Sequence, residues 1–220
     1  MHPDYKLLIF DWDGTLANSI ERIVEAMHAA SDRMGFARCD DMAVKGIIGL
    51  GLPEAIRSLY PEIDDLALPA FRQHYADHYI ALEAEPSPLF DGVAATLDAL
   101  RAEGYRLAVA TGKARRGLDR VLRSHGWDDY FDITRAADET ASKPHPLMLE
   151  QILAHCNMRP DQALMVGDSS FDLQMARNAG MGSVAVSYGA QSIEALRAFE
   201  PCLAIDHFPE LHAWLSRRAR

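Results

Sequence analysis

The sequence predicts an α/β protein: a doubly wound parallel sheet with an all-helical domain inserted after its first strand. Short apolar runs that do not alternate with polar residues indicate strands buried on both faces of a sheet. Helical patterns separate several of these runs, an alternation typical of a parallel sheet covered by helices. One long stretch after the first run contains helical patterns and no strand-like run, which predicts the insertion.

The first strand and the inserted helices occupy the N-terminal part of the chain. The apolar run LLIF predicts a strand over residues 7–10. Helical patterns follow it, and Pro53 suits the start of one of them because the fixed φ of proline fits the first turn of a helix. The helices predicted here cover residues 20–35, 52–60 and 67–84. A segment rich in turn residues, 85–92, then ends the helical stretch.

The alternation of strands and helices resumes near Leu89. The pattern over 91–104 ends at Gly104 and the pattern over 170–180 ends at Gly180, and glycine is common just beyond helix C-termini. The strands predicted here are 106–110, 163–166 and 183–186, with a weaker one at 203–205. The chain is therefore divided into an α/β core, residues 1–15 and 89–220, and a helical domain, residues 16–88.

Composition limits the classes of partner. The formal net charge of −10 disfavours nonspecific binding to nucleic acid or to anionic membranes, because both need a basic face. No segment approaches the roughly 20 apolar residues of a membrane span. The N-terminus lacks the pattern of a signal peptide, and the three cysteines form no CxxC pair. We expect a cytoplasmic protein, and the oligomeric state stays open.

Polar clusters follow three of the apolar runs at the point where each predicted strand ends. They are Asp11-Trp12-Asp13-Gly14-Thr15, Thr111-Gly112-Lys113 and Gly167-Asp168-Ser169-Ser170-Phe171-Asp172. The carboxyl ends of the strands line the ligand crevice of an open parallel sheet. We therefore expect these clusters to meet in space, although many residues separate them in the chain.

The expected meeting point is acidic and needs positive charge. It gathers Asp11, Asp13, Asp168 and Asp172, and four carboxylates repel one another without a cation. Carboxylate oxygens are preferred ligands of hard cations, so Mg²⁺ is the metal ion that we expect here. Lys143 adds a second positive charge. A lysine and a metal ion beside acidic oxygens indicate a site for a phosphate-bearing anion.

The same residues form four motifs in a familiar order. DWDGT, TGK, KP and GDSSFD resemble the motifs of the haloacid dehalogenase-like hydrolase superfamily, which consists mostly of phosphatases. The helical stretch 16–88 looks like the mobile helical cap of that superfamily, and the core then implied is Rossmann-like. Phrases such as DGVAATLDALRAEGY and VGDSSFDLQMARNAGM resemble its phosphoglycolate phosphatase-like branch.

The resemblance implies a role for each motif residue. Asp11 matches the nucleophile, which is already ionised at neutral pH and can attack phosphorus without a separate base. Asp13 matches the general acid/base that serves the leaving alcohol. Lys143 matches the lysine that neutralises the nucleophile and the phosphate. Thr111 and Gly112 match the residues that bind the phosphoryl oxygens, through a hydroxyl and through a backbone N–H.

The resemblance also implies the metal ligands. Asp11 and Asp168 match carboxylate ligands of Mg²⁺, and Asp13 matches a ligand that uses its backbone carbonyl. Asp172 matches a supporting carboxylate that orients metal-bound water or the lysine, and its direct ligation stays open. Gly112 departs from an asparagine that is common among similar proteins, which leaves the second phosphate contact to the backbone alone.

The implied function is a Mg²⁺-dependent phosphatase that hydrolyses a small phosphorylated metabolite through an aspartyl phosphate. Phosphoglycolate is the first expected substrate and a sugar phosphate the second. A phosphomutase of the β-phosphoglucomutase type uses the same motifs and is the alternative. A non-catalytic binding protein on the same fold is a second alternative, which the intact Asp11, Asp13, Lys143 and Asp168 disfavour.

Two further segments lie close to these motifs. Glycines at 46, 49 and 51 indicate a flexible loop that could close over a substrate, or an ordinary turn between helices. A basic run consists of Lys113, Arg115, Arg116, Arg120 and Arg123. We interpret the run as a solvated helix face, in which Lys113 could contact phosphate.

Overall fold

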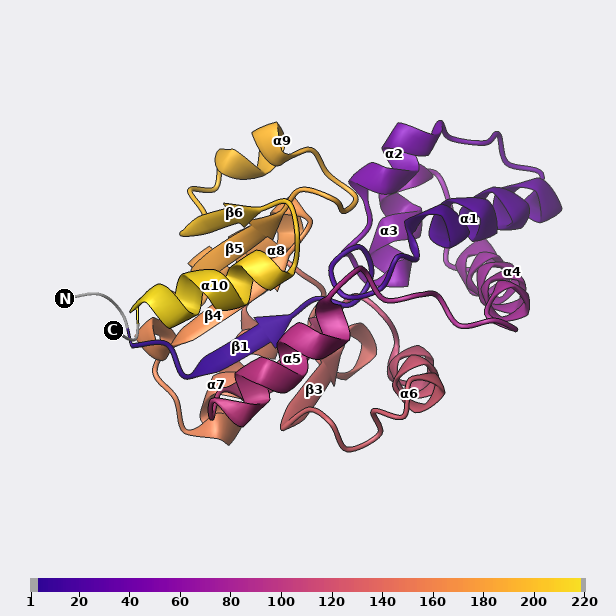
Figure 1. The fold of residues 1–220 in the computed structure, drawn as a ribbon. Coiled ribbons are helices and arrows are strands. Elements are labelled where there is room, and N and C mark those ends of the chain that lie inside the picture. The colour runs from indigo at the N-terminus through magenta and orange to yellow at the C-terminus, as the bar shows by residue number, and fades with distance from the viewer. Residues whose placement is uncertain (1–3, 219–220) are drawn as a thin grey trace.

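The computed structural model describes residues 4–218 and contains one six-stranded parallel sheet with helices on both faces (Figure 1). The strand order is β3-β2-β1-β4-β5-β6, and each neighbouring pair is parallel. The strands are β1 Leu7–Phe10, β2 Arg106–Thr111, β3 Ile133–Ala136, β4 Ala163–Gly167, β5 Gly182–Val186 and β6 Leu203–Ile205. The predicted fold class is confirmed.

The apolar runs form central strands because both faces of the sheet are covered. In β1, Leu8 and Phe10 pack into the apolar cluster that holds residues of the helices α5, α6 and α10. Leu7 and Ile9 alternate to the other face and pack with residues of α7 and α8. These helices are α5 Val93–Ala102, α6 Arg115–Ser124, α7 Leu147–Cys156, α8 Ser170–Asn178 and α10 Pro209–Arg218, and α9 Ile193–Arg197 lies beside β5.

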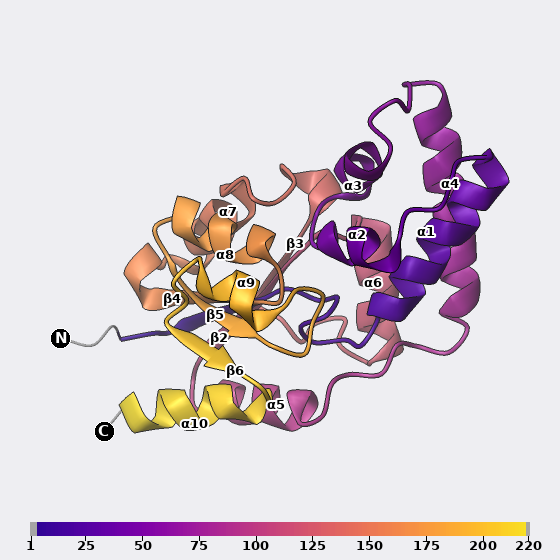
Figure 2. The ribbon, with the colours of Figure 1, turned by 90° about the horizontal axis from the view of Figure 1, so that it is seen from above.

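Four helices follow β1 and form an apolar cluster of their own. They are α1 Ile20–Met34, α2 Asp41–Gly46, α3 Leu52–Leu59 and α4 Ala67–Leu82. Figures 1 and 2 place them together beside the end of the sheet toward which β1 points. The chain thus carries this group of helices at the carboxyl ends of the strands.

One strand of the sheet has no counterpart among the predicted runs. β3 has the sequence ITRA, and its two central residues, Thr134 and Arg135, are polar and half-buried. It lies at an edge of the sheet, where it pairs only with β2. An edge strand needs no continuous apolar run because one side of it lies beyond the sheet. Within the described part of the chain, none of the helices is long and apolar enough to cross a bilayer.

Candidate active site

The first polar cluster continues the line of β1. The Asp11 N–H donates to the carbonyl of Val166 at 3.0 Å, so the ladder between β1 and β4 runs one residue past the strand. The chain then turns at Gly14, which has φ +78°. A Cβ at Gly14 would lie 2.1 Å from Asp168 Oδ2, so only glycine allows the turn to pass this close to the end of β4.

Three carboxylates meet at the carboxyl end of the sheet. Oxygens of Asp11, Asp168 and Asp172 all lie within 4.8 Å of one another, and the three residues are buried. Asp168 follows β4 directly, whereas Asp172 lies in the first turn of α8. Asp172 Oδ2 also accepts hydrogen bonds from the Ser169 N–H and hydroxyl, at 3.2 and 2.6 Å, which fix its carboxylate at the start of the helix.

Lys143 neutralises part of this charge. Its Nζ lies 2.6 Å from Asp172 Oδ1 and 2.8 Å from Asp11 Oδ1, and its side chain is fully buried. The contact with Asp11 is an ion pair without hydrogen-bond geometry, which leaves Asp11 Oδ1 with no hydrogen bond to the described residues. One ammonium therefore faces three carboxylates.

The excess of carboxylates shifts their protonation. Burial raises the pKa of Asp11 well above its ordinary value, and Lys143 opposes that shift. Burial and the neighbouring charge of Asp172 raise the pKa of Asp168 to about 7. Burial lowers the pKa of Lys143, but Asp11 and Asp172 outweigh it and raise that pKa above its ordinary value. The lysine stays charged, and the carboxylates need a further cation to be fully ionised.

The donor set fits a hard divalent cation. All the available ligand atoms are carboxylate oxygens, which Mg²⁺ prefers. A Mg²⁺ ion would offset the excess negative charge that Lys143 leaves, and it would engage the free oxygen of Asp11. The residues present therefore suit the metal that the motifs imply.

Asp13 is buried but turns away from the three carboxylates. Its Oδ1 accepts a hydrogen bond from the Ser19 hydroxyl at 2.6 Å and lies 3.0 Å from Lys113 Nζ. Ser19 directly precedes α1, so Asp13 faces the helical group. The sequence predicted four converging carboxylates, and the structure brings three together while Asp13 pairs with a lysine.

The contact between Asp13 and Lys113 was not predicted. The interpretation of the basic run as a solvated face was wrong for Lys113, whose side chain is only 10% exposed. Arg116 and Arg123 of the run are exposed, as expected. The signal that could have found the contact is the position of Lys113 two residues after β2, because β2 ends beside β1 and its Asp13.

Thr111 and Gly112 lie at the end of β2. Thr111 is fully buried, and its hydroxyl oxygen accepts a hydrogen bond from the Lys113 N–H at 3.2 Å. A Cβ at Gly112 would lie 2.4 Å from the Leu50 carbonyl oxygen and 2.7 Å from that of Gly49. The absence of a side chain at 112 therefore lets another backbone segment rest on this strand end.

That segment is the glycine-rich loop between α2 and α3, residues 47–51. The Gly51 N–H donates to the Ser142 hydroxyl at 2.8 Å, next to Lys143. A Cβ at Gly49 would lie 2.7 Å from Ser169 Oγ, beside the start of α8. The loop thus covers the carboxyl end of the sheet.

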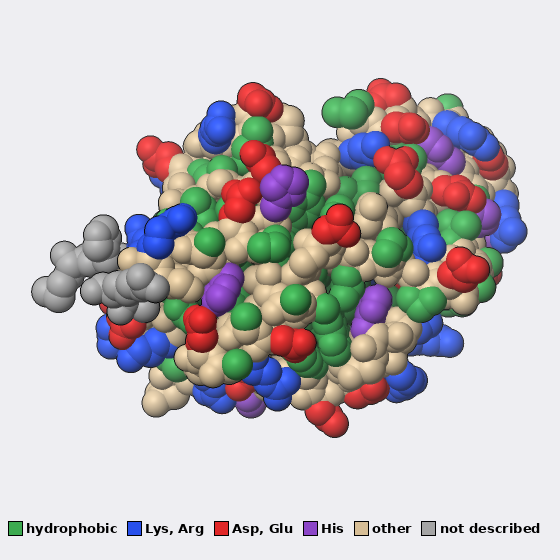
Figure 3. Space-filling view, viewed as in Figure 1, with side chains coloured by type: hydrophobic (Ala, Val, Ile, Leu, Met, Phe, Trp, Pro, Cys, Tyr) green, Lys and Arg blue, Asp and Glu red, His purple; other side chains and the backbone are tan. Residues whose placement is uncertain are grey.

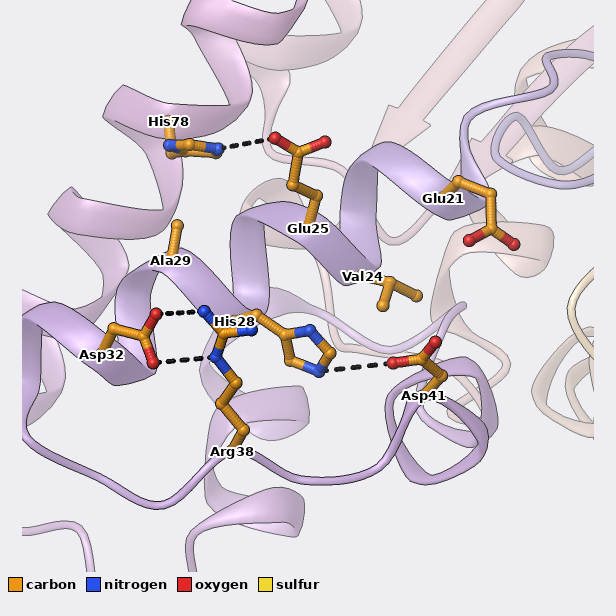
Figure 4. Close-up of a pocket in the computed structure, with 9 residues that line it drawn as sticks. All are labelled: Glu21, Val24, Glu25, His28, Ala29, Asp32, Arg38, Asp41 and His78. Carbon is orange, nitrogen blue, oxygen red and sulfur yellow. Dashed lines mark hydrogen bonds and ion pairs between the residues drawn. The ribbon is translucent and has the colours of Figure 1, made fainter.

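A hollow of about 430 Å³ lies elsewhere, on the surface of the helical group (Figure 4). Side chains from α1, α4 and the segment around α2 line it, and several pair across it. Glu25 contacts His78 at 3.2 Å, and Asp32 binds Arg38. None of the three clustered carboxylates contributes to the hollow, so we place the chemistry at the strand ends instead.

Comparison with known proteins connects this geometry to a family. Residues 8–186 match the family model described as haloacid dehalogenase-like hydrolase. A probable phosphatase, IndB, of Dickeya dadantii is 36% identical and covers 93% of this chain and 91% of its own. A phosphoglycolate phosphatase of Vibrio vulnificus is 32% identical, with 94% and 95% covered. The crystal structure of a haloacid dehalogenase-like hydrolase from Bacteroides fragilis superposes with a TM-score of 0.87, at 30% identity and 94% and 99% coverage.

Proposed function

The chain belongs to the haloacid dehalogenase-like hydrolase family, and from this membership we propose a Mg²⁺-dependent phosphatase that acts on a small phosphorylated metabolite. Its relatives along nearly the whole chain are phosphatases, and the chain is a hydrolase of that kind. The observation that carries the proposal is the buried cluster of Asp11, Asp168, Asp172 and Lys143 at the strand ends. Phosphoglycolate, the substrate named for the Vibrio relative, is the first candidate, and a sugar phosphate is the second.

Asp11 is the proposed nucleophile. Its carboxylate oxygen would bond to phosphorus while the bond from phosphorus to the alcohol oxygen breaks, which leaves an aspartyl phosphate. In the substrate complex, Asp13 would act in its protonated form, give that proton to the departing oxygen and later take one from the water that hydrolyses the aspartyl phosphate. These steps return the enzyme to its starting state, with phosphate and an alcohol released.

The neighbouring groups hold the phosphoryl oxygens. The Thr111 hydroxyl and the Gly112 N–H lie at the end of β2, beside β1, and would donate to those oxygens. Lys143 would neutralise charge on Asp11 and on the phosphoryl group, and such positioning and charge stabilisation dominate phosphoryl transfer.

Asp11, Asp168 and the backbone carbonyl of Asp13 would hold Mg²⁺, with Asp172 in support. When bound, the ion supplies Lewis-acid stabilisation of the phosphoryl oxygens. Asp172 already binds Lys143 Nζ at 2.6 Å, so its own part is to keep the lysine beside Asp11.

The helices α1–α4 are the proposed cap, over residues 16–88, on a core of residues 1–15 and 89–220. Their separate apolar cluster supports this division, because each part then has its own core. The loop 47–51 is the part of the proposed cap that lies over the strand ends, where it would exclude water from the aspartyl phosphate.

The replacement Asp13→Asn should slow hydrolysis most for esters with poor leaving groups. An alkyl phosphate needs a proton on the departing oxygen, and losing a general acid costs about 10²–10⁴-fold in rate. p-Nitrophenyl phosphate should lose much less in its first step, because nitrophenolate leaves without a proton. Burst kinetics on both esters measure the difference. Equal losses on both would remove the acid role from Asp13.

Metal binding should show itself in thermal stability without any substrate. The pKa of Asp168 is raised from 3.8 to about 7, so the folded protein holds a proton there that the unfolded chain loses. In EDTA, stability should therefore fall as the pH rises from about 4 through about 7. Mg²⁺ should raise the melting temperature more at pH 8 than at pH 5, because it binds ionised carboxylates.

The matched control for this experiment is Asp168→Asn, which removes the titrating group and keeps its shape. Its melting temperature in EDTA should depend less on pH than that of the wild type, and Mg²⁺ should stabilise it less. Identical pH profiles for the two proteins, with no response to Mg²⁺ at pH 8, would argue against the metal site.

A phosphate-release screen over a panel of metabolites, with and without Mg²⁺, tests the function itself. Release from one or more esters only with Mg²⁺ supports the phosphatase. A sugar 1-phosphate that is isomerised without free phosphate would indicate the phosphomutase instead. A flat response across the whole panel would favour a non-catalytic binding protein.

A small phosphorylated metabolite as the partner, without nucleic acid or membrane, and a cytoplasmic location complete the proposal. Acidic and basic side chains are interspersed on the face shown in Figure 3, on a chain of net charge −10, which does not suit a polyanion such as nucleic acid. Cys39, Cys156 and Cys202 are free thiols, which suits a reducing compartment.

A further inference from the structure

Lys113 is a buried cation at the boundary between the end of β2 and the helix α4. Its Nζ lies 3.0 Å from Asp13 Oδ1 and 3.0 Å from the Tyr79 hydroxyl oxygen. The same atom lies 4.5 Å from the centroid of the Tyr79 ring. An aspartate at the end of β1 and a tyrosine of the helical group therefore hold one ammonium between them.

The groups around Lys113 leave part of its bonding capacity free. An ammonium has three N–H donors, of which one donates to the Tyr79 hydroxyl, while Asp13 pairs with the charge at 3.0 Å. Glu83, the other acid nearby, is bound to Arg120 at 2.7 Å instead. Tyr75 stacks on Tyr79, with ring centroids 5.8 Å apart. Among residues 4–218, Lys113 Nζ has no hydrogen-bond partner besides Tyr79 and no ion-pair partner besides Asp13.

Lys113 also stays positively charged in this position. Burial lowers its pKa, but the negative charge of Asp13 and the nearby oxygens of Tyr79, Glu83 and Tyr75 outweigh burial and raise that pKa well above its ordinary value. A buried cation with a spare donor is a strong attractor for a second anion, because charge-assisted hydrogen bonds are worth more than neutral ones.

The position relative to Asp13 identifies which part of a substrate would meet Lys113. The departing oxygen takes a proton from Asp13, so it must come within about 2.7 Å of an Asp13 oxygen. Lys113 Nζ lies 3.0 Å from that same carboxylate, whereas Lys143 pairs with Asp11 and Asp172. The ammonium therefore faces the leaving alcohol rather than the phosphoryl group.

This inference rests on the proposed function: we propose that Lys113 recognises a negative charge on the leaving alcohol, namely a carboxylate attached directly to the carbon that bears the ester oxygen. In such a 2-phosphooxy acid only three bonds separate the ester oxygen from the carboxylate oxygen. One oxygen can then meet Asp13 while the other meets the free N–H of Lys113. The leaving phosphate of pyrophosphate carries negative charge at a similar distance from the bridging oxygen as the carboxylate does from the ester oxygen. Pyrophosphate is therefore included in the test.

The test compares three substrates: phosphoglycolate, pyrophosphate and 2-hydroxyethyl phosphate, which has a neutral hydroxymethyl group in place of the carboxylate. Wild-type kcat/KM should favour phosphoglycolate over 2-hydroxyethyl phosphate. Lys113→Met should lower kcat/KM for both, since the lysine also holds Asp13, but should reduce the ratio between them by about 10–100-fold. Lys113→Arg keeps the charge and should keep most of the ratio.

Arg123→Met is the matched control, because Arg123 is an exposed cation of the same basic run, and it should leave all rates unchanged. Equal losses on the charged and neutral esters in Lys113→Met would overturn the proposal and leave Lys113 as a positioning residue for Asp13. A wild type that prefers 2-hydroxyethyl phosphate would overturn it as well. If Lys113→Met lowers kcat/KM more for pyrophosphate than for phosphoglycolate, the proposal of a carboxylate is overturned, and the group that Lys113 binds is a leaving phosphate.

A measurement of ligand binding tests the role of Lys113 independently of the proposed phosphatase activity. Calorimetric titration of Asp11→Asn with each ester, in Mg²⁺, needs no turnover, and the double variant with Lys113→Met should lose affinity chiefly for phosphoglycolate. If no ester releases phosphate, the proposed function fails while the titration still decides the role of Lys113. If Lys113→Met does not fold, the wild-type ratio and the Arg variant decide it.

Discussion

Asp11→Asn should abolish phosphate release, with a loss of about 10⁴-fold or more in kcat, because it removes the attacking oxygen and little else. Asparagine has nearly the shape of aspartate, and the substitution leaves the bond from the backbone N–H of residue 11 to the Val166 carbonyl in place. Removing one of three neighbouring carboxylates also relieves repulsion from Asp168 and Asp172, which contributes to the raised pKa of Asp11. The melting temperature in EDTA should therefore stay level or rise.

Phosphate release over the metabolite panel and thermal melting measure the two effects. Asp91→Asn is the matched control, since Asp91 is exposed and lies just before α5. Its activity and stability should equal those of the wild type. Phosphate release by Asp11→Asn at the wild-type rate would refute the assignment of the nucleophile.

Lys143→Met should damage both stability and activity. The methionine fills similar volume but leaves Asp11 and Asp172 without their ammonium, and breaking a buried ion pair costs about 3–5 kcal/mol in the free energy of unfolding. The activity should fall by about 10³-fold, as when a group that stabilises transition-state charge is removed. Denaturant unfolding in EDTA and phosphate-release kinetics in Mg²⁺ check the two results.

Magnesium separates the two contributions of Lys143. It should restore part of the stability of Lys143→Met by neutralising the carboxylates, yet leave the activity low because the phosphoryl group still lacks the lysine. Lys6→Met is the control, because Lys6 is half-exposed and should change stability by about 0.5 kcal/mol or less. A Lys143→Met protein as stable and active as this control would show that the lysine has neither role.

The strand ends could be predicted because a buried parallel strand leaves a continuous apolar run in the sequence. The runs at β1, β2, β4 and β5 match the structure to within a residue, and each polar cluster that follows a run lies at the same edge of the sheet. That topology predicted the meeting of Asp11, Asp168 and Asp172, whereas the position of Lys143 was expected from the family resemblance. No distance between them had to be known in advance.

The features that escaped prediction depend on packing between distant segments. β3 is a short polar edge strand, so its sequence lacks the signal of a buried one. The burial of Lys113 depends on α4, which brings Tyr79 over it. Gly112 suggested only a weaker phosphate contact, whereas the structure shows the backbone of Gly49 and Leu50 resting against it. None of these contacts has a local pattern in the chain.

The position of loop 47–51 over the strand ends has a consequence for the turnover rate of the enzyme. The Leu50 and Gly49 carbonyls rest against Gly112, so under the proposed function a substrate would reach the strand ends by lifting the loop. Lifting breaks the bond from Gly51 to Ser142 and the weaker one from Gln191 to the Gly46 carbonyl, at 3.4 Å. Under the proposed function, each catalytic cycle would break and remake these two bonds, so we expect loop opening to set an upper limit on the turnover rate.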